Sequence, residues 1–260
     1  MDSSDLVSCT DTPDLDFKWL KQAANGDEAL LSRYIARRQK GEPVAKIIGQ
    51  KGFWTLDLKV SKDTLDPRPD SETIIDAVLK NFPDKSASLR ILDLGTGSGC
   101  LLLALLSEYP NATGIGMDAS AAALQIAKQN AEKYAPKRSK LICRSWDEDN
   151  WWNDLGGFDV VVCNPPYIPS SEIETLDVDV KNYDPLNALD GGADGLQDYR
   201  ILSDSVAQVL KQNGMIFFEI GQGQEKDVKS IMEKKKFILK ASYYDLGHIL
   251  RVLAFSHKNT

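Results

Sequence analysis

The sequence predicts an α/β protein in which helices cover both faces of a mostly parallel β-sheet. Short apolar runs recur along the chain from about residue 89, and segments with apolar residues at helical spacing separate them. Strands that alternate with helices of this length form a parallel sheet. At 260 residues and 28.8 kDa, the chain can hold one such domain with a small addition, or two modest domains.

The first part of the chain is predicted to be helical. Residues 1–16 are polar, and we expect a loose lead-in there. Apolar residues at helical spacing from Phe17 to about Lys40 predict two short helices, separated by a turn at "NGD" (25–27). Residues 52–60, "GFWTLDLKV", alternate like a strand or hairpin arm. We therefore predict a small helical domain over residues 1–48, a β-hairpin linker over 49–66 and a larger domain over 67–260.

The elements of the larger domain follow in order. A helix is expected over residues 71–82, with Ser71 or Asp70 as its N-cap. Strands are expected at 89–95, 112–118, 140–144, 158–163 and 214–220. Helices are expected at 99–108, 119–134, about 196–212 and 223–235, and two late strands at about 237–244 and 249–256.

Charge and composition exclude several classes of protein. The net charge of −7 and pI of about 5.0 argue against broad binding to a phosphate backbone. One basic group, Arg33, Arg37, Arg38 and Lys40, is interpreted as a solvated helix face. The four cysteines form no CxxC pair, and only two histidines are present, so we expect reduced thiols and no metal site. We expect no secretory signal, transit peptide or membrane span, and therefore a cytoplasmic location.

A glycine-rich loop, "DLGTGSG" (93–99), stands where the first strand of the sheet turns into a helix. Glycines at such a turn let the backbone approach a ligand, and the helix N-terminus offers free N–H groups. The dinucleotide fingerprint G-x-G-x-x-G would require glycine at position 100, where Cys100 stands. The spacing G-x-G-x-G resembles the loop of S-adenosylmethionine-dependent methyltransferases. This resemblance makes Gly95, Thr96, Gly97, Ser98 and Gly99 candidate cofactor-binding residues.

Asp118 ends the second strand, about twenty residues after the glycine loop. An acidic residue at this position can bind the two hydroxyl groups of a ribose. Asp118 could instead cap the helix that follows it. Together with the glycine loop, it favours a nucleoside cofactor in the crevice at the carboxyl ends of the strands.

Asn164, Pro165, Pro166 and Tyr167 follow the strand at 158–163, whose carboxyl end faces the same crevice. The Asn164 amide presents one acceptor and two donors. The prolines fix φ and donate no N–H, which holds the neighbouring carbonyl oxygens in place. Two acceptors converging on an –NH₂ group, with Tyr167 as a flat stacking face, suit methylation of a conjugated nitrogen. The alternative is a rigid turn with a capping asparagine.

The NPPY tetrad with the DLGTGSG loop resembles amino-methyltransferases that act on exocyclic or amide nitrogens. Further segments narrow this resemblance: "RRQKGEPVAKIIGQKGFW" (37–54), "PRPDSE" (67–72), "YDPLNALDGGADGLQDYR" (183–200), "FFEIGQGQ" (217–224) and "DLGHILRVLAF" (245–255). In these, from about Arg37 onward, the chain is similar to the peptide chain release factor glutamine methyltransferases. That family methylates the glutamine side chain in the Gly-Gly-Gln loop of release factors.

The resemblance implies a Rossmann-like class I methyltransferase fold, with a shortened helical N-terminal domain. It implies that the glycine loop and Asp118 bind S-adenosylmethionine and that Trp146 lies beside the adenine. Trp146 could instead be a buried anchor near Trp151 and Trp152. Asn164 would touch cofactor and substrate. The substrate glutamine would lie between Asn164, Pro165, Pro166 and Tyr167, with Arg68 to Glu72 covering it.

The partners implied are class 1 release factors, met by a monomeric enzyme without a metal and without a membrane. A nucleic-acid amino-methyltransferase, acting on adenine-N6 of DNA or guanine-N2 of rRNA, is the alternative. A DNA enzyme needs a basic cleft and usually a target-recognition region, for which this acidic chain has no spare length. A degenerate fold that serves only as a binding module is the non-enzymatic alternative.

Overall fold

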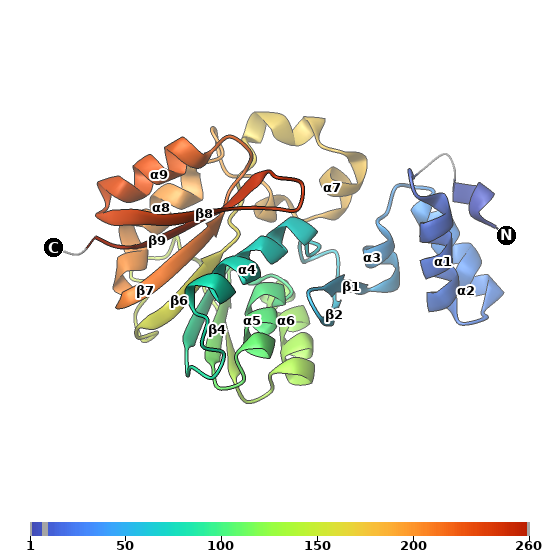
Figure 1. Cartoon of the computed structure of the whole chain (residues 1–260). Coiled ribbons are helices and arrows are strands. Elements are labelled where there is room, and N and C mark those ends of the chain that lie inside the picture. Colours follow the sequence, from blue (N-terminus) through green and yellow to red (C-terminus); the bar gives the residue numbers. More distant parts are fainter. Residues whose placement is uncertain (1, 7–9, 259–260) are drawn as a thin grey trace.

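The computed structural model describes residues 2–6 and 10–258, and its centre is a seven-stranded β-sheet (Figure 1). The strands, in spatial order, are β5 (Ser139–Cys143), β4 (Thr113–Asp118), β3 (Arg90–Leu94), β6 (Phe158–Cys163), β7 (Leu210–Glu219), β9 (Leu250–His257) and β8 (Phe237–Tyr244). The first five are parallel to one another, and β9 pairs antiparallel with β7 and β8. The predicted fold class is confirmed.

Helices cover both faces of this sheet (Figure 1). On one face lie α4 (Glu72–Asn81), α5 (Cys100–Glu108) and α6 (Ala121–Tyr134), and on the other α8 (Gln197–Ser205) and α9 (Glu225–Lys234). Apart from Asp159, β6 consists of apolar residues, as expected for a strand that is buried on both sides. Val160 and Val162 pack in the cluster with α4 and α5, and Val161 and Cys163 pack in the cluster with α8 and α9.

The strand order creates a crevice at the carboxyl ends of the strands. The chain runs from β3 outward through β4 to β5 and then returns to β6, on the other side of β3. Sheets of this kind bind their ligands at the carboxyl ends of the strands where the order reverses. The ends of β3 and β6, which lead into the glycine loop and into Asn164, meet at this point.

The N-terminal helices form a separate hydrophobic cluster, and Figure 1 shows them apart from the sheet. They are η1 (Ser3–Leu6), a 3₁₀ helix, with α1 (Pro13–Ala24), α2 (Glu28–Arg38) and α3 (Val44–Ile48). The expected loose lead-in is wrong for the described residues, because α1 begins at Pro13, where proline suits the first turn, and Leu6 is fully buried. Residues 1 and 7–9, with Cys9, lie outside the described residues. The domain boundaries at 48 and 66 stay a prediction.

The predicted hairpin is present, as β1 (Gln50–Phe53) and β2 (Leu56–Lys59) in antiparallel pairing. Asn130 of α6 connects it to the glycine loop. The Asn130 side chain accepts a hydrogen bond from Lys59 N (2.8 Å) and donates to the carbonyl oxygens of Lys59 (3.0 Å) and Ser98 (2.9 Å). The hairpin is thereby held against the base of the crevice.

Two predictions about the second half of the chain need correction. The helix expected over about 196–212 ends at Ser205, and after a short 3₁₀ turn (η5, Val206–Gln208) β7 begins at Leu210. Residues 168–190, to which no element was assigned, contain η3 (Ser170–Thr175), α7 (Val178–Tyr183) and η4 (Leu186–Ala188). No helix within the described ranges has both the length and the apolar character of a membrane span.

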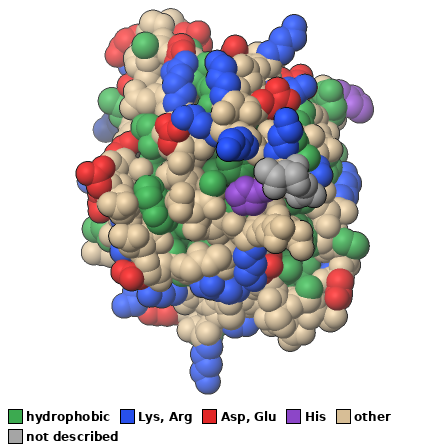
Figure 2. Space-filling view, turned by 90° about the vertical axis from the view of Figure 1, so that its left-hand side faces the viewer, with side chains coloured by type: hydrophobic (Ala, Val, Ile, Leu, Met, Phe, Trp, Pro, Cys, Tyr) green, Lys and Arg blue, Asp and Glu red, His purple; other side chains and the backbone are tan. Residues whose placement is uncertain are grey.

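Two members of the basic group, Arg37 and Arg38, form ion pairs. Arg37 pairs with Glu42 (2.5 Å), and Arg38 pairs with Asp16 (2.7 Å) with both side chains mostly buried. Arg38 is therefore not part of a solvated helix face. Its ion pair with Asp16 connects α2 to α1. Figure 2 shows the face around the carboxyl terminus, where lysine and arginine side chains lie in separate groups among acidic and apolar ones.

Candidate functional site

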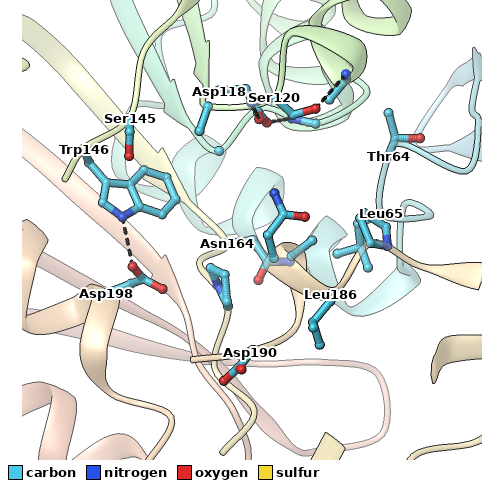
Figure 3. A pocket seen from close by; sticks show the side chains of 18 of the residues that line it. Thr64, Leu65, Asp118, Ser120, Ser145, Trp146, Asn164, Leu186, Asp190 and Asp198 are labelled. Atoms are coloured by element: carbon cyan, nitrogen blue, oxygen red, sulfur yellow. Dashed lines mark hydrogen bonds between the residues drawn. The ribbon is translucent and has the colours of Figure 1, made fainter. Parts of the chain in front are cut away.

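A cavity of about 820 Å³ opens at the carboxyl ends of β3, β4 and β6 (Figure 3). Six of the residues singled out from the sequence line it: Gly95, Gly97, Asp118, Trp146, Asn164 and Pro166. A cavity of this size can enclose a nucleoside together with a substrate side chain. Polar groups of the glycine loop, β4 and the NPPY loop therefore converge on one space.

The glycine loop is held against the end of β4. Gly95 N and Thr96 N both donate to the Met117 carbonyl oxygen, at 2.8 and 3.0 Å. Gly95 has a positive φ of 73°, and a Cβ atom there would lie 3.2 Å from the Trp146 ring. Glycine is therefore required by both backbone conformation and space at this position.

The other three loop residues do not line the cavity. Thr96 is buried, and its hydroxyl donates to Asp93 Oδ2 at 2.6 Å. The Ser98 carbonyl accepts the hydrogen bond from Asn130, and Gly99 precedes α5 with a φ of 85°. Thr96, Ser98 and Gly99 hold the loop in shape, whereas Gly95 and Gly97 present the backbone to the cavity.

Asp118 is anchored by two backbone N–H groups. Its Oδ2 accepts from Gly97 N and its Oδ1 from Ser120 N, both at 2.8 Å. Burial raises the pKa of Asp118, and these two hydrogen bonds act in the opposite direction. The alternative role as the cap of α6 is not the one observed, because the Ser120 hydroxyl accepts from Ala123 N (3.1 Å) and caps that helix. Asp118 instead faces the cavity (Figure 3).

Trp146 forms another part of the cavity wall. Its indole Nε1 donates to Asp198 Oδ1 at 2.9 Å, as Figure 3 shows, and its ring lies beside Gly95. Burial raises the pKa of Asp198, and the hydrogen bond from Trp146 lowers it. Trp151, by contrast, is buried in the core and packs edge-on against Trp152. Asp198 was missed as a site residue, although it lies within the "DGLQDYR" segment.

Only part of the NPPY loop, residues 164–167, lines the cavity. Asn164 and Pro166 line the cavity, and Asn164 Nδ2 donates to Ser71 Oγ at 3.2 Å. Pro165 is buried. The Tyr167 phenol interacts with the charges of Glu219 and Arg251, and burial raises its pKa. The structure thus brings Asn164 to the site and does not bring the Tyr167 ring to the cavity wall.

The segment Arg68–Glu72, predicted to cover the site, is fastened at each end. Arg68 pairs with Asp184 (2.5 Å) and Asp70 pairs with Arg251 (2.7 Å). Glu72 Oε1 accepts a hydrogen bond from Trp54 N (2.7 Å). None of these residues is among those that line the cavity, but Asp63, Thr64 and Leu65, just before them, are.

A buried lysine holds the mouth of the cavity together. Lys46 Nζ lies 2.9 Å from Asp66 Oδ1 and 3.1 Å from Asp184 Oδ1. It also donates to the carbonyl oxygens of Ser61 (2.8 Å) and Thr64. Burial raises the pKa of Asp66, and the Lys46 charge opposes this shift.

The cluster around Lys46 joins α3 to two parts of the cavity wall, residues 63–65 and residues 185–188, which sequence reasoning missed. Within the ranges 2–6 and 10–258, no three His, Cys, Asp or Glu side chains gather as a metal-binding group.

Comparisons with known proteins agree with this geometry. A family model described as a methyltransferase domain matches residues 85–250. The fold is similar to that of a methyltransferase from Pyrococcus furiosus, with a TM-score of 0.58 and 18% identity, over 88% of this chain and 100% of that one. This likeness bears on the fold alone.

Two curated relatives are more similar in sequence. A release factor glutamine methyltransferase of Rhodospirillum rubrum is 47% identical over 78% of this chain, which spans 61% of that relative's length. A release factor glutamine methyltransferase of Agrobacterium fabrum is 43% identical over 88% of this chain, which spans 79% of its length. With the glycine loop and NPPY loop placed at one cavity, the chain belongs to the release factor glutamine methyltransferase family.

Proposed function

We propose that the protein uses S-adenosylmethionine to methylate the N5 atom of the glutamine in the Gly-Gly-Gln motif of peptide chain release factors. The observation that carries this proposal is the position of Asn164. Its amide lines the cavity beside the glycine loop, while its nitrogen is engaged by Ser71. The amide oxygen is thus available as an acceptor for a substrate –NH₂ group.

The cavity fits the cofactor by the chemistry of its walls. Gly97 has open space on its side-chain position, where no atom lies closer than 4.0 Å, and Gly95 has no room for a Cβ. The Asp118 oxygens each accept one N–H group and retain lone pairs for a ribose diol. The Trp146 ring offers a flat apolar face for an adenine. Bound S-adenosylmethionine would supply an electrophilic methyl group on a positively charged sulfur.

The residues of the NPPY loop would hold the nucleophile. We propose that Asn164 Oδ1 and the carbonyl group of Pro165 accept the two N–H bonds of the substrate amide. An amide nitrogen is a poor nucleophile because its lone pair is delocalised, and hydrogen bonds that strengthen as this nitrogen pyramidalises favour the transition state over the ground state. Pro165 and Pro166 would keep the loop rigid, because the proline rings fix φ, and the Tyr167 side chain would pack behind the loop. No strong base is needed in advance, because the nitrogen loses its proton after the new bond forms.

The acidic balance of the chain supports a protein substrate rather than a nucleic acid. The net charge is −7, and the acids Asp63, Asp118, Asp147, Asp190 and Asp198 line the cavity. A phosphate backbone would be repelled there, whereas a Gly-Gly-Gln loop carries no charge of its own. A cytoplasmic, monomeric enzyme without a metal is the form that we expect to act on release factors.

Mass spectrometry tests this proposal. Class 1 release factor is incubated with the protein and methyl-labelled S-adenosylmethionine, and the Gly-Gly-Gln peptide is expected to gain one methyl group. A release factor with alanine in place of that glutamine is the matched control and should gain none. Labelling of DNA or rRNA, with a rate that falls steeply as salt rises, and no labelling of the peptide would overturn the proposal.

A further inference from the structure

The two prolines of the NPPY loop leave it with few backbone groups that can donate hydrogen bonds. Pro165 and Pro166 have no N–H group. The beginning of the loop is fixed at Cys163, because β6 pairs there with both β3 and β7. The position of the other end, at Tyr167, therefore depends on contacts from other parts of the chain.

The Gln224 side chain binds the Tyr167 end of the loop. Gln224 holds the N-cap position of α9 but makes no side-chain capping bond there. Its Nε2 instead donates to the carbonyl oxygens of Tyr167 (2.9 Å) and Gly195 (3.1 Å). Its Oε1 accepts from Gly221 N at 2.9 Å. One amide thus joins three segments, namely the NPPY loop, the turn before α8 and the turn after β7.

The three partners match the hydrogen-bonding capacity of a glutamine side chain. Two carbonyl oxygens need donors and one backbone N–H needs an acceptor, and a primary amide offers two N–H bonds and one oxygen. A carboxylate has no hydrogen to donate, and an ammonium or guanidinium group has no acceptor. Among side chains of this length, only glutamine satisfies all three partners, so the orientation of the Gln224 amide is determined by its surroundings.

Three glycines bring other segments into direct contact with the same part of the loop. A Cβ atom at Gly191 would lie 2.7 Å from the Pro166 carbonyl oxygen. At Gly195, where φ is 71°, a Cβ atom would overlap the Tyr167 carbonyl oxygen. At Gly221 it would lie 3.1 Å from Cδ2 of the Tyr167 ring. The loop therefore packs against backbone rather than against flexible side chains, and this packing determines its position closely.

A displacement of Tyr167 would be transmitted to the proposed site of reaction. The Tyr167 carbonyl lies two residues after the Pro165 carbonyl, which we propose as an acceptor for the substrate amide. Proline fixes φ at positions 165 and 166 and also restricts the residue before each proline. The loop between Asn164 and Tyr167 is therefore stiff and moves as a unit. A misplacement of about 1 Å in a reacting geometry can cost about 100-fold in rate.

We propose that Gln224 is a positioning residue that holds the Tyr167 end of the NPPY loop, so that the Pro165 carbonyl faces the substrate amide. This inference rests on the proposed function. Gln224 does not line the cavity and acts only through the loop. The proposal also gives a role to "DGGADG" (190–195) and "GQGQ" (221–224), which lie in two of the segments singled out from the sequence.

Two substitutions of similar size separate the hydrogen bonds of this amide. Gln224→Met removes all three, whereas an ionised Gln224→Glu keeps an acceptor for Gly221 N and loses both donors. Above neutral pH, we expect both variants to lower kcat by about tenfold or more, with the Kd for S-adenosylmethionine changed by less than about threefold. A wild-type kcat in Gln224→Glu would show that donation to Tyr167 is not needed and would overturn the inference.

Gln222→Met is the matched control. Gln222 lies two residues earlier and is exposed, and among the described residues its side chain has no hydrogen-bond partner. Its kcat should stay within about twofold of the wild type. Circular dichroism shows whether each variant is folded at the assay temperature, so that kcat refers to folded enzyme. Equal losses of kcat in Gln222→Met and Gln224→Met would contradict the inference.

A measurement without substrate separates this inference from the proposed function. With ¹³C at the carbonyl of tyrosine and ¹⁵N in isoleucine, a carbonyl–nitrogen correlation arises only where isoleucine follows tyrosine, at Tyr34–Ile35 and Tyr167–Ile168. Tyr34→Phe removes the first signal and thereby assigns the second. In both Gln224 variants the Tyr167 carbonyl signal should shift, because it loses a hydrogen bond, whereas the Tyr34 signal should stay in place.

The outcomes of this measurement have distinct meanings. An unshifted Tyr167 signal in Gln224→Met would overturn the inference even if the variant is less active. A shifted signal with unchanged kcat in both Gln224 variants would also overturn it, because the loop would then not need this anchor for the reaction. A shifted signal in Gln224→Met, together with a wild-type protein that does not methylate release factor, would overturn the proposed function and leave the anchoring of the loop in place.

Discussion

The Lys46 ammonium and the Asp184 carboxylate form a buried ion pair, with 3.1 Å between Nζ and Oδ1. Both side chains are at most 3% exposed, and Asp66 shares the same ammonium. Lys46 belongs to α3, whereas Asp184 follows α7 and precedes the part of the cavity wall at η4. The Lys46 ammonium therefore connects the N-terminal helices to the two chain segments that border the cavity.

Replacement of Lys46 by methionine should destabilise the protein strongly. Two buried carboxylates would lose their cation, and breaking such a cluster costs about 3–5 kcal/mol. Urea unfolding followed by circular dichroism measures the change in unfolding free energy. Lys211→Met is the matched control, because Lys211 pairs with Asp159 at 2.7 Å near the surface, and its loss should cost less than about 1 kcal/mol. Equal losses in both variants would contradict the importance of the Lys46 cluster.

Trp146→Ala should weaken binding of S-adenosylmethionine by about tenfold, because the proposed adenine wall beside Gly95 is lost. Isothermal titration calorimetry measures the Kd. Trp152→Ala is the comparison, since Trp152 packs against Trp151 and does not line the cavity, and we expect a change of less than about twofold. An unchanged Kd in Trp146→Ala would remove Trp146 from the cofactor site.

Asp118→Ala should also act on cofactor affinity. The change removes the proposed ribose acceptor and leaves Gly97 N and Ser120 N without partners, so a rise in Kd of about tenfold or more is expected. At saturating cofactor, kcat should remain within about threefold of the wild type. A variant with normal affinity and lowered kcat would place Asp118 in the chemical step instead.

Asn164→Ala should show the converse pattern. Loss of an acceptor that works mainly in the transition state is expected to lower kcat by about 100-fold or more. The cofactor Kd should change by less than about threefold, because the glycine loop, Asp118 and Trp146 remain. Single-turnover rates with saturating release factor measure the effect. Retention of the wild-type rate would refute the proposed role of Asn164.

Glu219→Gln should change the dependence of stability on pH. Burial raises the pKa of Glu219 from about 4.5 to about 7. The folded state therefore binds more protons than the unfolded state between these values, and the unfolding free energy of the wild type falls as pH rises from 4.5 to 7. Glutamine does not titrate. Relative to the wild type, Glu219→Gln should gain about 3 kcal/mol between pH 4 and pH 8.

Thermal unfolding across this pH range measures the gain, since Tm should rise in the variant relative to the wild type above pH 7. If Tm depends on pH in the same way in both proteins, the pKa of Glu219 is not raised in the folded state.

The sheet and half of the cavity were predictable from sequence because their signals are local. β6 and the strands beside it are short apolar runs that end in turn residues, and the glycine loop and Asn164 stand at the ends of such runs. The helix predicted to end at 212 was too long because Val206, Val209 and Leu210 continue the helical spacing, although the last of them already belongs to β7. Periodicity alone does not separate these two cases.

The far walls of the cavity were not predictable, since tertiary contacts create them. Trp146 was identified by resemblance, but its partner Asp198 arrives from α8. Ser71 satisfied the local rule for an N-cap, and only the folded chain shows that Asn164 takes its hydroxyl. Leu65 and Leu186 lie in segments without regular periodicity and reach the cavity through the cluster around Lys46.

The separate hydrophobic cluster of the N-terminal helices has a practical consequence for building chimeras. Helices α1 and α2 pack on one another and on α3, through Val44 and Ile47. A graft from another family member that joins the chain near residue 41 would therefore keep α3, and with it the Lys46 cluster. The first two helices could then be exchanged without rebuilding the part of the chain that forms the cavity, provided that the donor helices accept those two aliphatic side chains.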